Sequence, residues 1–205
     1  PGNFAVDDHG DLRIIGNQSP RYRYGVNLSA RWNGIGLSVF LQGVGARDWY
    51  PGSDAGMFWG KYGRPFFALI PSIHNYTDDM YSAERNNWDT AYWPRMTTYQ
   101  SNGTKNWTRL LEIPNTRYIQ SAAYLRVKNI QLDYSFPKHI CSAIRLQGLK
   151  IYVNAENLFT FTPLHKYAPN FDPEGLSYDS DFASAADGYT YPILKSVTVG
   201  VNITF

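Results

Sequence analysis

The chain contains no apolar run approaching the roughly 20 residues that a membrane-spanning helix requires, which excludes a helical membrane protein. Charged residues make up only 18% of the sequence, and the formal net charge of +2 comes without a basic cluster, so nothing favours nucleic-acid binding. A single cysteine, Cys141, excludes an internal disulfide and a cysteine-based metal site. The four histidines are scattered, so we predict no metal site and no cofactor. Aromatic residues, in contrast, are abundant at 16%.

The last nine residues, VTVGVNITF (197–205), alternate between apolar and polar side chains without an error. Successive side chains of a strand point to opposite faces, so this segment has one apolar and one polar face. A strand of a soluble sandwich can show the same alternation. A strand that faces lipid on one side shows it too, and the terminal aromatic Phe205 is typical of such a strand.

Four further segments repeat this pattern, and each is about ten residues long, which is enough to span a bilayer when tilted. The dipeptide Asn33-Gly34 separates the first two segments and suits a two-residue hairpin turn, because both residues must adopt positive φ. In the third segment the apolar parity changes around Lys128-Asn129, which predicts a β-bulge. The predicted strands are residues 21–32, 35–47, 122–136, 149–161 and 193–205.

Short and long connections alternate between these strands. The turn at 33–34 and the segment 137–148 are short, whereas residues 48–120 and 162–190 are long. Outer-membrane barrels place short turns in the periplasm and long loops outside the cell. The sequence therefore predicts an all-β fold, a transmembrane antiparallel β-barrel, with extracellular loops at 1–20, 48–120 and 162–190.

Five strands cannot close a transmembrane barrel, because two unpaired edges would be left in lipid. The sequence also begins at Pro1 without a signal peptide, although a barrel must be secreted to reach its membrane. We therefore expect this chain to be the C-terminal segment of a larger barrel domain.

Several runs in this chain occur in a distinctive order and spacing: PRYRYGVNLS (20–29), FLQGVGARD (40–48), AYLRVKNIQLDYSFP (123–137), LKIYVNAENLFTF (149–161) and FDPE (171–174). Together with Tyr191-Pro192 before the last strand, they resemble the end of the SusC-like TonB-dependent transporters, the SusC/RagA family. The resemblance covers the strands of nearly the whole chain.

This resemblance implies that the five strands are about numbers 18 to 22 of a 22-stranded barrel in the outer membrane of a Gram-negative bacterium. The plug domain and the segment that contacts the TonB complex would lie outside this chain. A SusD-like surface lipoprotein would cover the barrel from outside. Such pairs import nutrients, most often oligosaccharides and in some members peptides.

Residues 48–120 contain many more aromatic rings than a simple connection requires. Flat rings beside polar groups can bind sugar, since sugar rings present apolar C–H faces. A long loop can equally use its rings to form a small core of its own or to contact the covering lipoprotein. The candidate ligand-binding residues are Trp59, Tyr62, Trp88 and Trp107.

Polar side chains that face the predicted lumen form a second candidate set. Their simplest role is a solvated barrel wall or a surface against which the plug packs, although some could bind a passing solute. They are Arg23, Asn27, Arg31, Gln42, Lys150, Tyr152, Asn154 and Glu156.

A function of another class, an outer-membrane enzyme or adhesin, would place the activity in the long loops. The sequence shows no nucleophile elbow, phosphate-binding loop or carboxylate pair with catalytic spacing, so we predict no enzymatic activity and no catalytic residues.

Phe205 should lie at the periplasmic edge of the membrane, and by resemblance to other outer-membrane proteins its strand is the signal for barrel assembly. Deleting Phe205 should lower the amount of assembled protein in the outer membrane, measured by surface labelling and heat modifiability. Normal surface levels combined with a changed substrate preference would contradict this prediction.

Overall fold

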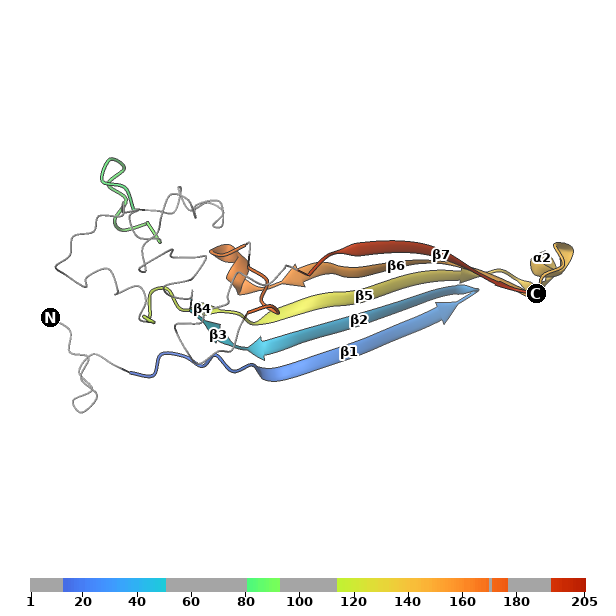
Figure 1. Cartoon of the computed structure of the whole chain (residues 1–205), viewed down its shortest axis with the longest axis horizontal. Coiled ribbons are helices and arrows are strands. Elements are labelled where there is room, and N and C mark those ends of the chain that lie inside the picture. Colours follow the sequence, from blue (N-terminus) through green and yellow to red (C-terminus); the bar gives the residue numbers. More distant parts are fainter. Residues whose placement is uncertain (1–12, 51–80, 93–113, 170, 177–192) are drawn as a thin grey trace.

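The structure is a computed structural model that describes residues 13–50, 81–92, 114–169, 171–176 and 193–205. One long antiparallel sheet dominates it, with its hairpin turns at one end and the long connections at the other (Figure 1). We call these ends the turn end and the loop end. None of the helices in the described residues is long and apolar enough to cross a membrane.

Five strands form this sheet in the order β1-β2-β5-β6-β7, and every neighbouring pair is antiparallel. A separate two-stranded sheet at the loop end pairs β3 (Asp48–Trp49) with β4 (Gln120–Ser121). The prediction of an all-β antiparallel fold is confirmed. The strands of the main sheet are β1 (Arg21–Trp32), β2 (Ile35–Ala46), β5 (Tyr124–Ser135), β6 (Gly148–Phe161) and β7 (Ser196–Thr204).

The tight turn between β1 and β2 has the predicted geometry. Asn33 has φ of 52° and Gly34 has φ of 88°, the positive values that this hairpin turn requires. The carbonyl of Gly34 accepts a hydrogen bond of 2.8 Å from the backbone N–H of Ser135, which ties the turn to β5.

The β-bulge predicted around Lys128-Asn129 is also present. The pairing of β5 with β6 shifts between Val127 and Asn129, and the pairing of β5 with β2 shifts at the same level. Relative to β2, β5 has one extra residue at this level, Lys128, which moves the apolar positions of β5 from odd to even numbers. In the pairing with β6, the extra residue is on β6 instead, between Glu156 and Phe159. As a result, the apolar side chains of β5 stay on one face of the sheet along its whole length.

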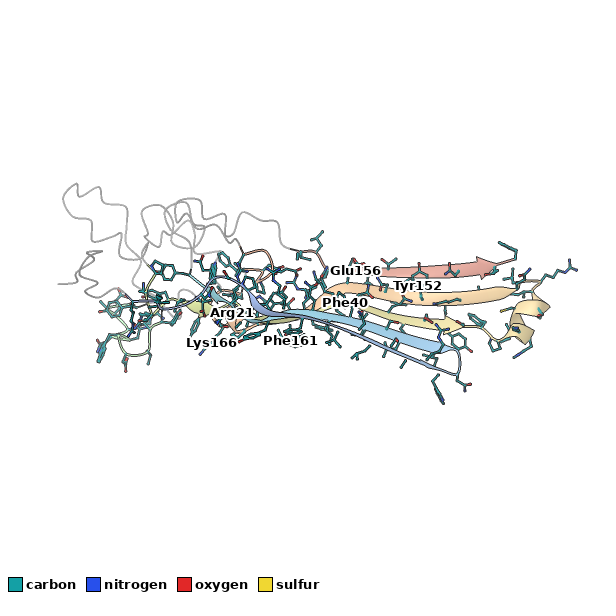
Figure 2. All side chains as sticks on the ribbon, turned by 90° about the horizontal axis from the view of Figure 1, so that it is seen from below. Arg21, Phe40, Tyr152, Glu156, Phe161 and Lys166 are labelled. Carbon is teal, nitrogen blue, oxygen red and sulfur yellow. The ribbon has the colours of Figure 1, made fainter. Side chains whose placement is uncertain are left out.

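The register sorts the side chains of all five strands into an apolar face and a polar face. Figure 2 shows side chains leaving the sheet on two opposite sides, with Phe40, Tyr152 and Glu156 on the side opposite to Phe161. Many side chains of the apolar face are exposed, including Phe159 at 53%, Val197 at 66% and Val199 at 72%. An apolar surface this extensive requires a partner, and lipid is the partner that an alternating strand of this length fits.

Two glycines on the polar face lie under large side chains of the neighbouring strands. A Cβ atom on Gly200 would come within 2.3 Å of the Tyr152 ring, and one on Gly36 within 2.5 Å of the Asp133 carboxylate. Both glycines belong to one row of paired residues that crosses the five strands. This row is Arg31, Gly36, Asp133, Tyr152 and Gly200.

The connections contain more regular structure than the sequence predicted. The segment 137–148, predicted to be a plain short turn, includes the helix α2 (Lys138–Ala143). Cys141 therefore lies in a helix, where its side chain is buried and its Sγ atom is 3.7 Å from the Phe136 carbonyl oxygen. The range 48–120 likewise begins and ends in β3 and β4, and the 3₁₀ helix η4 (Pro163–Lys166) follows β6.

The sheet allows a test of its two faces with adjacent residues of β7. Val199→Arg places a charge on the apolar face and should destabilise the folded barrel by about 2–4 kcal/mol if that face meets the bilayer. The control, Thr198→Arg, places the same charge on the polar face, beside its partner Asn154, and should cost much less. The measurement is the yield of heat-modifiable protein in outer-membrane fractions. Equal losses for the two variants would contradict the assignment of faces.

Candidate lumen wall and loop cluster

The polar face contains all eight residues that the sequence predicted to face the lumen. The register gives Arg23, Asn27 and Arg31 the same face of β1, and their partners on the next strands share it. That this face lines a lumen stays a prediction. The eight residues do not form one cluster, because they are spread over three strands from the turn end to the loop end.

Near the turn end, Asp133 of β5 forms ion pairs with two of these residues. Its carboxylate lies 3.3 Å from Nη2 of Arg31 and 3.0 Å from Nζ of Lys150. The two cations come from β1 and β6, on either side, and the missing side chain of Gly36 leaves room for Arg31 to reach across β2. Asp133 is only 6% exposed, and burying a carboxylate is costly unless cations pair with it. Arg31 and Lys150 together offset this cost.

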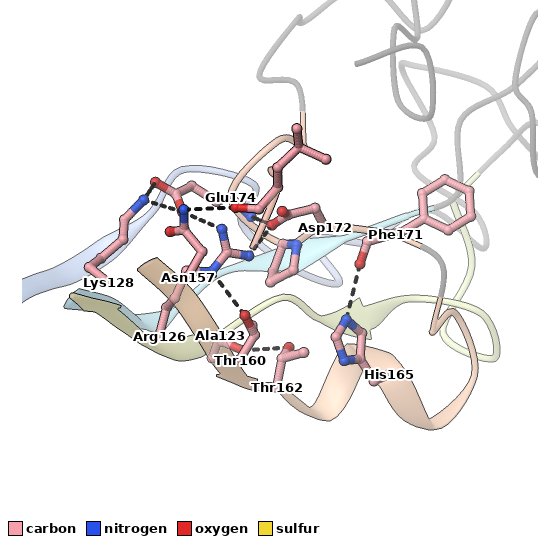
Figure 3. A network of polar contacts seen from close by, with 12 residues as sticks. Ala123, Arg126, Lys128, Asn157, Thr160, Thr162, His165, Phe171, Asp172 and Glu174 are labelled. Carbon is pink, nitrogen blue, oxygen red and sulfur yellow. Dashed lines mark hydrogen bonds and ion pairs between the residues drawn. The ribbon is translucent and has the colours of Figure 1, made fainter. Parts of the chain in front are cut away.

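At the loop end, Arg126 of β5 connects the sheet to the segment that follows β6. Its Nε donates to Oγ1 of Thr160 at 2.9 Å, and its two Nη atoms contact Asp172 and Glu174 (Figure 3). Lys128, the bulge residue, holds the other oxygen of Glu174 at 2.8 Å. Arg126 is 3% exposed, so its charge is buried but matched by two carboxylates.

Arg47 holds the same segment through backbone atoms. Its Nη1 and Nη2 donate to the carbonyls of Pro173 at 3.2 Å and Leu176 at 2.9 Å, and its Nε donates to the carbonyl of Gln18. Nε2 of His165 lies 3.2 Å from the carbonyl oxygen of Phe171 (Figure 3). The residues after β6 are therefore fixed onto the polar face by side chains of the wall itself. We call residues 171–176 the clamped segment.

Beside the clamped segment, aromatic side chains of the long connections pack against one another. Trp49 and Phe171 have ring centroids 5.1 Å apart, and Tyr92 stacks on Tyr167 at 3.6 Å. Burial raises the pKa of the Tyr92 hydroxyl to about 12, and Tyr167 contributes to the increase. The buried members of this loop cluster are Trp49, Tyr50, Tyr118, Ala122, Leu164, Ala168, Phe171 and Leu176.

The loop cluster bears on the two roles considered for aromatic residues of the long loop. Trp49, Tyr50 and Tyr118 are buried in a core of the connections themselves, as self-packing requires. Trp88, one of the four candidate ligand-binding residues, is 71% exposed and stays a candidate. The other three, Trp59, Tyr62 and Trp107, lie outside the described residues.

Phe205 is 83% exposed at the turn end.

A hollow of about 520 Å³ opens on the polar face beside the clamped segment. Its walls include Arg23 and Gln42, two of the predicted residues, together with Phe40 and Glu174. No group of three or more His, Cys, Asp or Glu residues is placed to hold a metal ion in the described part of the chain.

The residues that organise both ends of the polar face were not predicted from the sequence. The alternation of β5 places Arg126 and Asp133 on the polar face, so the same pattern that identified the other lumen-facing residues could have identified these two. Their partners could not be found in this way. Asp172 and Glu174 belong to an irregular connection, and nothing in its sequence says that it folds back onto the sheet.

A sheet with one exposed apolar face, one hydrogen-bonding face and membrane-spanning strand lengths is typical of the wall of a transmembrane β-barrel. Over nearly its whole length the chain is similar to TonB-dependent receptors, which confirms the predicted resemblance to TonB-dependent transporters. TonB-dependent receptors P3, P39 and P26 of Formosa agariphila are 25%, 24% and 22% identical to it over 95%, 100% and 95% of its length. No protein-family model matches the chain.

Solved structures show the same fold. The RagAB peptide importer in its open-open state superposes with a TM-score of 0.57 over 97% of the chain at 20% identity. A structure of the RagAB peptide transporter gives a TM-score of 0.56 over 95% at 19% identity. The chain spans only 17–18% of the length of the receptors from Formosa agariphila and 18% of the solved RagAB chains.

The clamp around Arg126 predicts a local change in stability. Arg126→Gln removes the buried cation that Asp172 and Glu174 share, although Glu174 keeps Lys128, so the clamped segment should be loosened by about 1–3 kcal/mol. Lys128→Gln, the control, removes a more exposed cation with one partner and should cost less. Hydrogen exchange at the Gly175 amide, which donates to the Asp172 carbonyl, reports the opening. Unchanged exchange in Arg126→Gln would contradict the clamp.

Proposed function

We propose that this chain forms part of the barrel wall of a TonB-dependent importer in the outer membrane of a Gram-negative bacterium. One observation supports this most strongly: the exposed apolar face and the hydrogen-bonding face belong to the same five-stranded sheet. The similarity to TonB-dependent receptors over nearly the whole chain agrees with it. In this proposal the plug, the TonB-contacting segment and most of the lumen lie in other parts of the protein.

The orientation proposed for this barrel follows from its two ends. Residues 1–20, 48–120 and 162–190 lie outside the cell, and the turn end with α2 and Phe205 lies in the periplasm. The loop cluster and the clamped segment then sit at the external mouth of the barrel. A SusD-like lipoprotein covers that mouth, and the exposed Trp88 is a candidate contact for it.

The proposed ligand is an oligosaccharide. Sugar hydroxyls both donate and accept hydrogen bonds, as do the amide side chains Asn27, Gln42 and Asn154 of the polar face. A second candidate ligand is a peptide, because the structurally similar RagAB proteins are a peptide importer and a peptide transporter. The relatives are receptors and transporters, and we propose no enzymatic activity for this protein.

Uptake measurements test this function and its energy source. Cells that express the whole protein should accumulate fluorescent oligosaccharides from a pool of different linkages, and deletion of TonB should reduce uptake at least tenfold. Uptake of a pool of fluorescent peptides of similar mass is measured in parallel. Uptake of peptides alone would exclude the sugar assignment, and equal uptake with and without TonB would contradict the proposed mechanism.

A further inference from the structure

The polar face divides into three zones along the strands. Ion pairs occupy both ends, around Asp133 near the turn end and around Arg126 near the loop end. Between them lie two rows of paired residues with a single charge, that of Glu156. We call these rows the amide band; they are Asn27, Phe40, Asn129, Glu156 and Ser196, then Ser29, Ser38, Gln131, Asn154 and Thr198.

The amide groups of this zone are not used by the fold. Among the described residues, no partner is found for the side chains of Asn27, Asn129 or Gln131, or for Gln42 one row above. The Oδ1 atom of Asn154 is shielded from solvent and also lacks a hydrogen-bond partner there. Unpaired amides gathered on one surface are available to a bound molecule.

Phe40 is the apolar exception in the amide band. It breaks the polar alternation of β2, and its partners across the sheet are Asn27 and Asn129. Its ring lies across the backbone of Gly25, where an added Cβ would be 3.3 Å from Cε2, and the side chain stays partly exposed. The ring also forms one wall of the 520 Å³ hollow, next to Gln42 and Pro173.

From this arrangement we infer that Phe40, with the amides around it, is a stacking subsite for an uncharged sugar ring. The apolar C–H face of a pyranose covers the phenyl ring, and the amides of Asn27, Gln42 and Asn129 pair with its hydroxyls. The hollow has the volume of a small-molecule site. This inference rests on the proposed import function and adds the residues that contact the ligand.

The charges nearby argue against a peptide at this subsite. A peptide carries a terminal carboxylate that needs a cation, but Arg126 and Lys128 already hold Asp172 and Glu174. Arg23, the cation of β1 in the wall of the hollow, is not free either. The guanidinium of Arg47 is bonded to three backbone carbonyls. A neutral ligand needs none of these charges.

Phe40 could instead serve only to cover Gly25, and variants of matched size separate the two roles. Phe40→Leu still covers the glycine but removes the flat ring, whereas Phe40→Tyr keeps both. Phe159→Ala, on the apolar face, is the control for loss of a ring elsewhere in the same sheet. Yields of folded protein are measured for every variant.

The experiment incubates the purified whole protein with two defined mixtures and identifies the retained molecules by mass spectrometry. One mixture holds neutral hexasaccharides with α-1,4, β-1,4 and β-1,3 linkages, and the other holds hexapeptides. Titration then gives the affinity of each retained molecule. Phe40→Leu and Asn129→Ala should each weaken sugar binding about tenfold, the effect of one aromatic or hydrogen-bonding contact, while Phe40→Tyr and Phe159→Ala keep it.

The three possible outcomes distinguish the sugar subsite from the proposed import function. Sugar binding that Phe40→Leu leaves unchanged overturns the subsite and leaves the import function standing. Retention of peptides alone overturns the sugar subsite and favours peptide import. Retention of neither mixture counts against the proposed function itself and therefore against the subsite.

Discussion

The whole arrangement depends on the strict alternation of side chains along strands whose backbone groups are hydrogen-bonded to one another. Lipid cannot satisfy a backbone N–H or C=O group, so a membrane wall must pair every strand before its side chains matter. Alternation then gives each strand one face for lipid and one for water. The bulge at Lys128 shows how strictly this alternation is kept, because one extra residue relative to β2 keeps the apolar side chains of β5 on the same face over its second half.

The two buried charges of the polar face, those of Asp133 and Arg126, are matched by charges of opposite sign. Asp133 has a cation on each side, and Arg126 has two carboxylates supplied by the clamped segment. A buried ion without such partners would be costly, so these groups fix the positions of their neighbours. The amide band between them has one charge, that of Glu156, and its neutral amides can be left to water or to a ligand.

The sequence predicted what depends on local periodicity and failed where structure depends on distant contacts. Alternation, the Asn33-Gly34 turn and the parity change at Lys128 were enough to predict the strands, the hairpin and the bulge. The helix α2 was missed because six residues give too short a pattern. The clamped segment was missed because Asp172 and Glu174 meet Arg126 only after the connection that follows β6 has folded back onto the sheet. Candidate residues on strands could thus be given a face, whereas those in the long connections could not be placed.

The ring of Tyr152 above Gly200 has a consequence for how the last strand finds its partner. Alternation alone cannot distinguish the native pairing of β6 and β7 from one displaced by two residues, because both keep apolar side chains on the same face. A displacement by two would bring Thr198 or Asn202 opposite Tyr152, where a Cβ atom would lie 2.3 Å from the ring and force the ring to move. Gly200, the smallest residue of β7, therefore favours the native register over the displaced pairings, which would leave the same side chains on the apolar face.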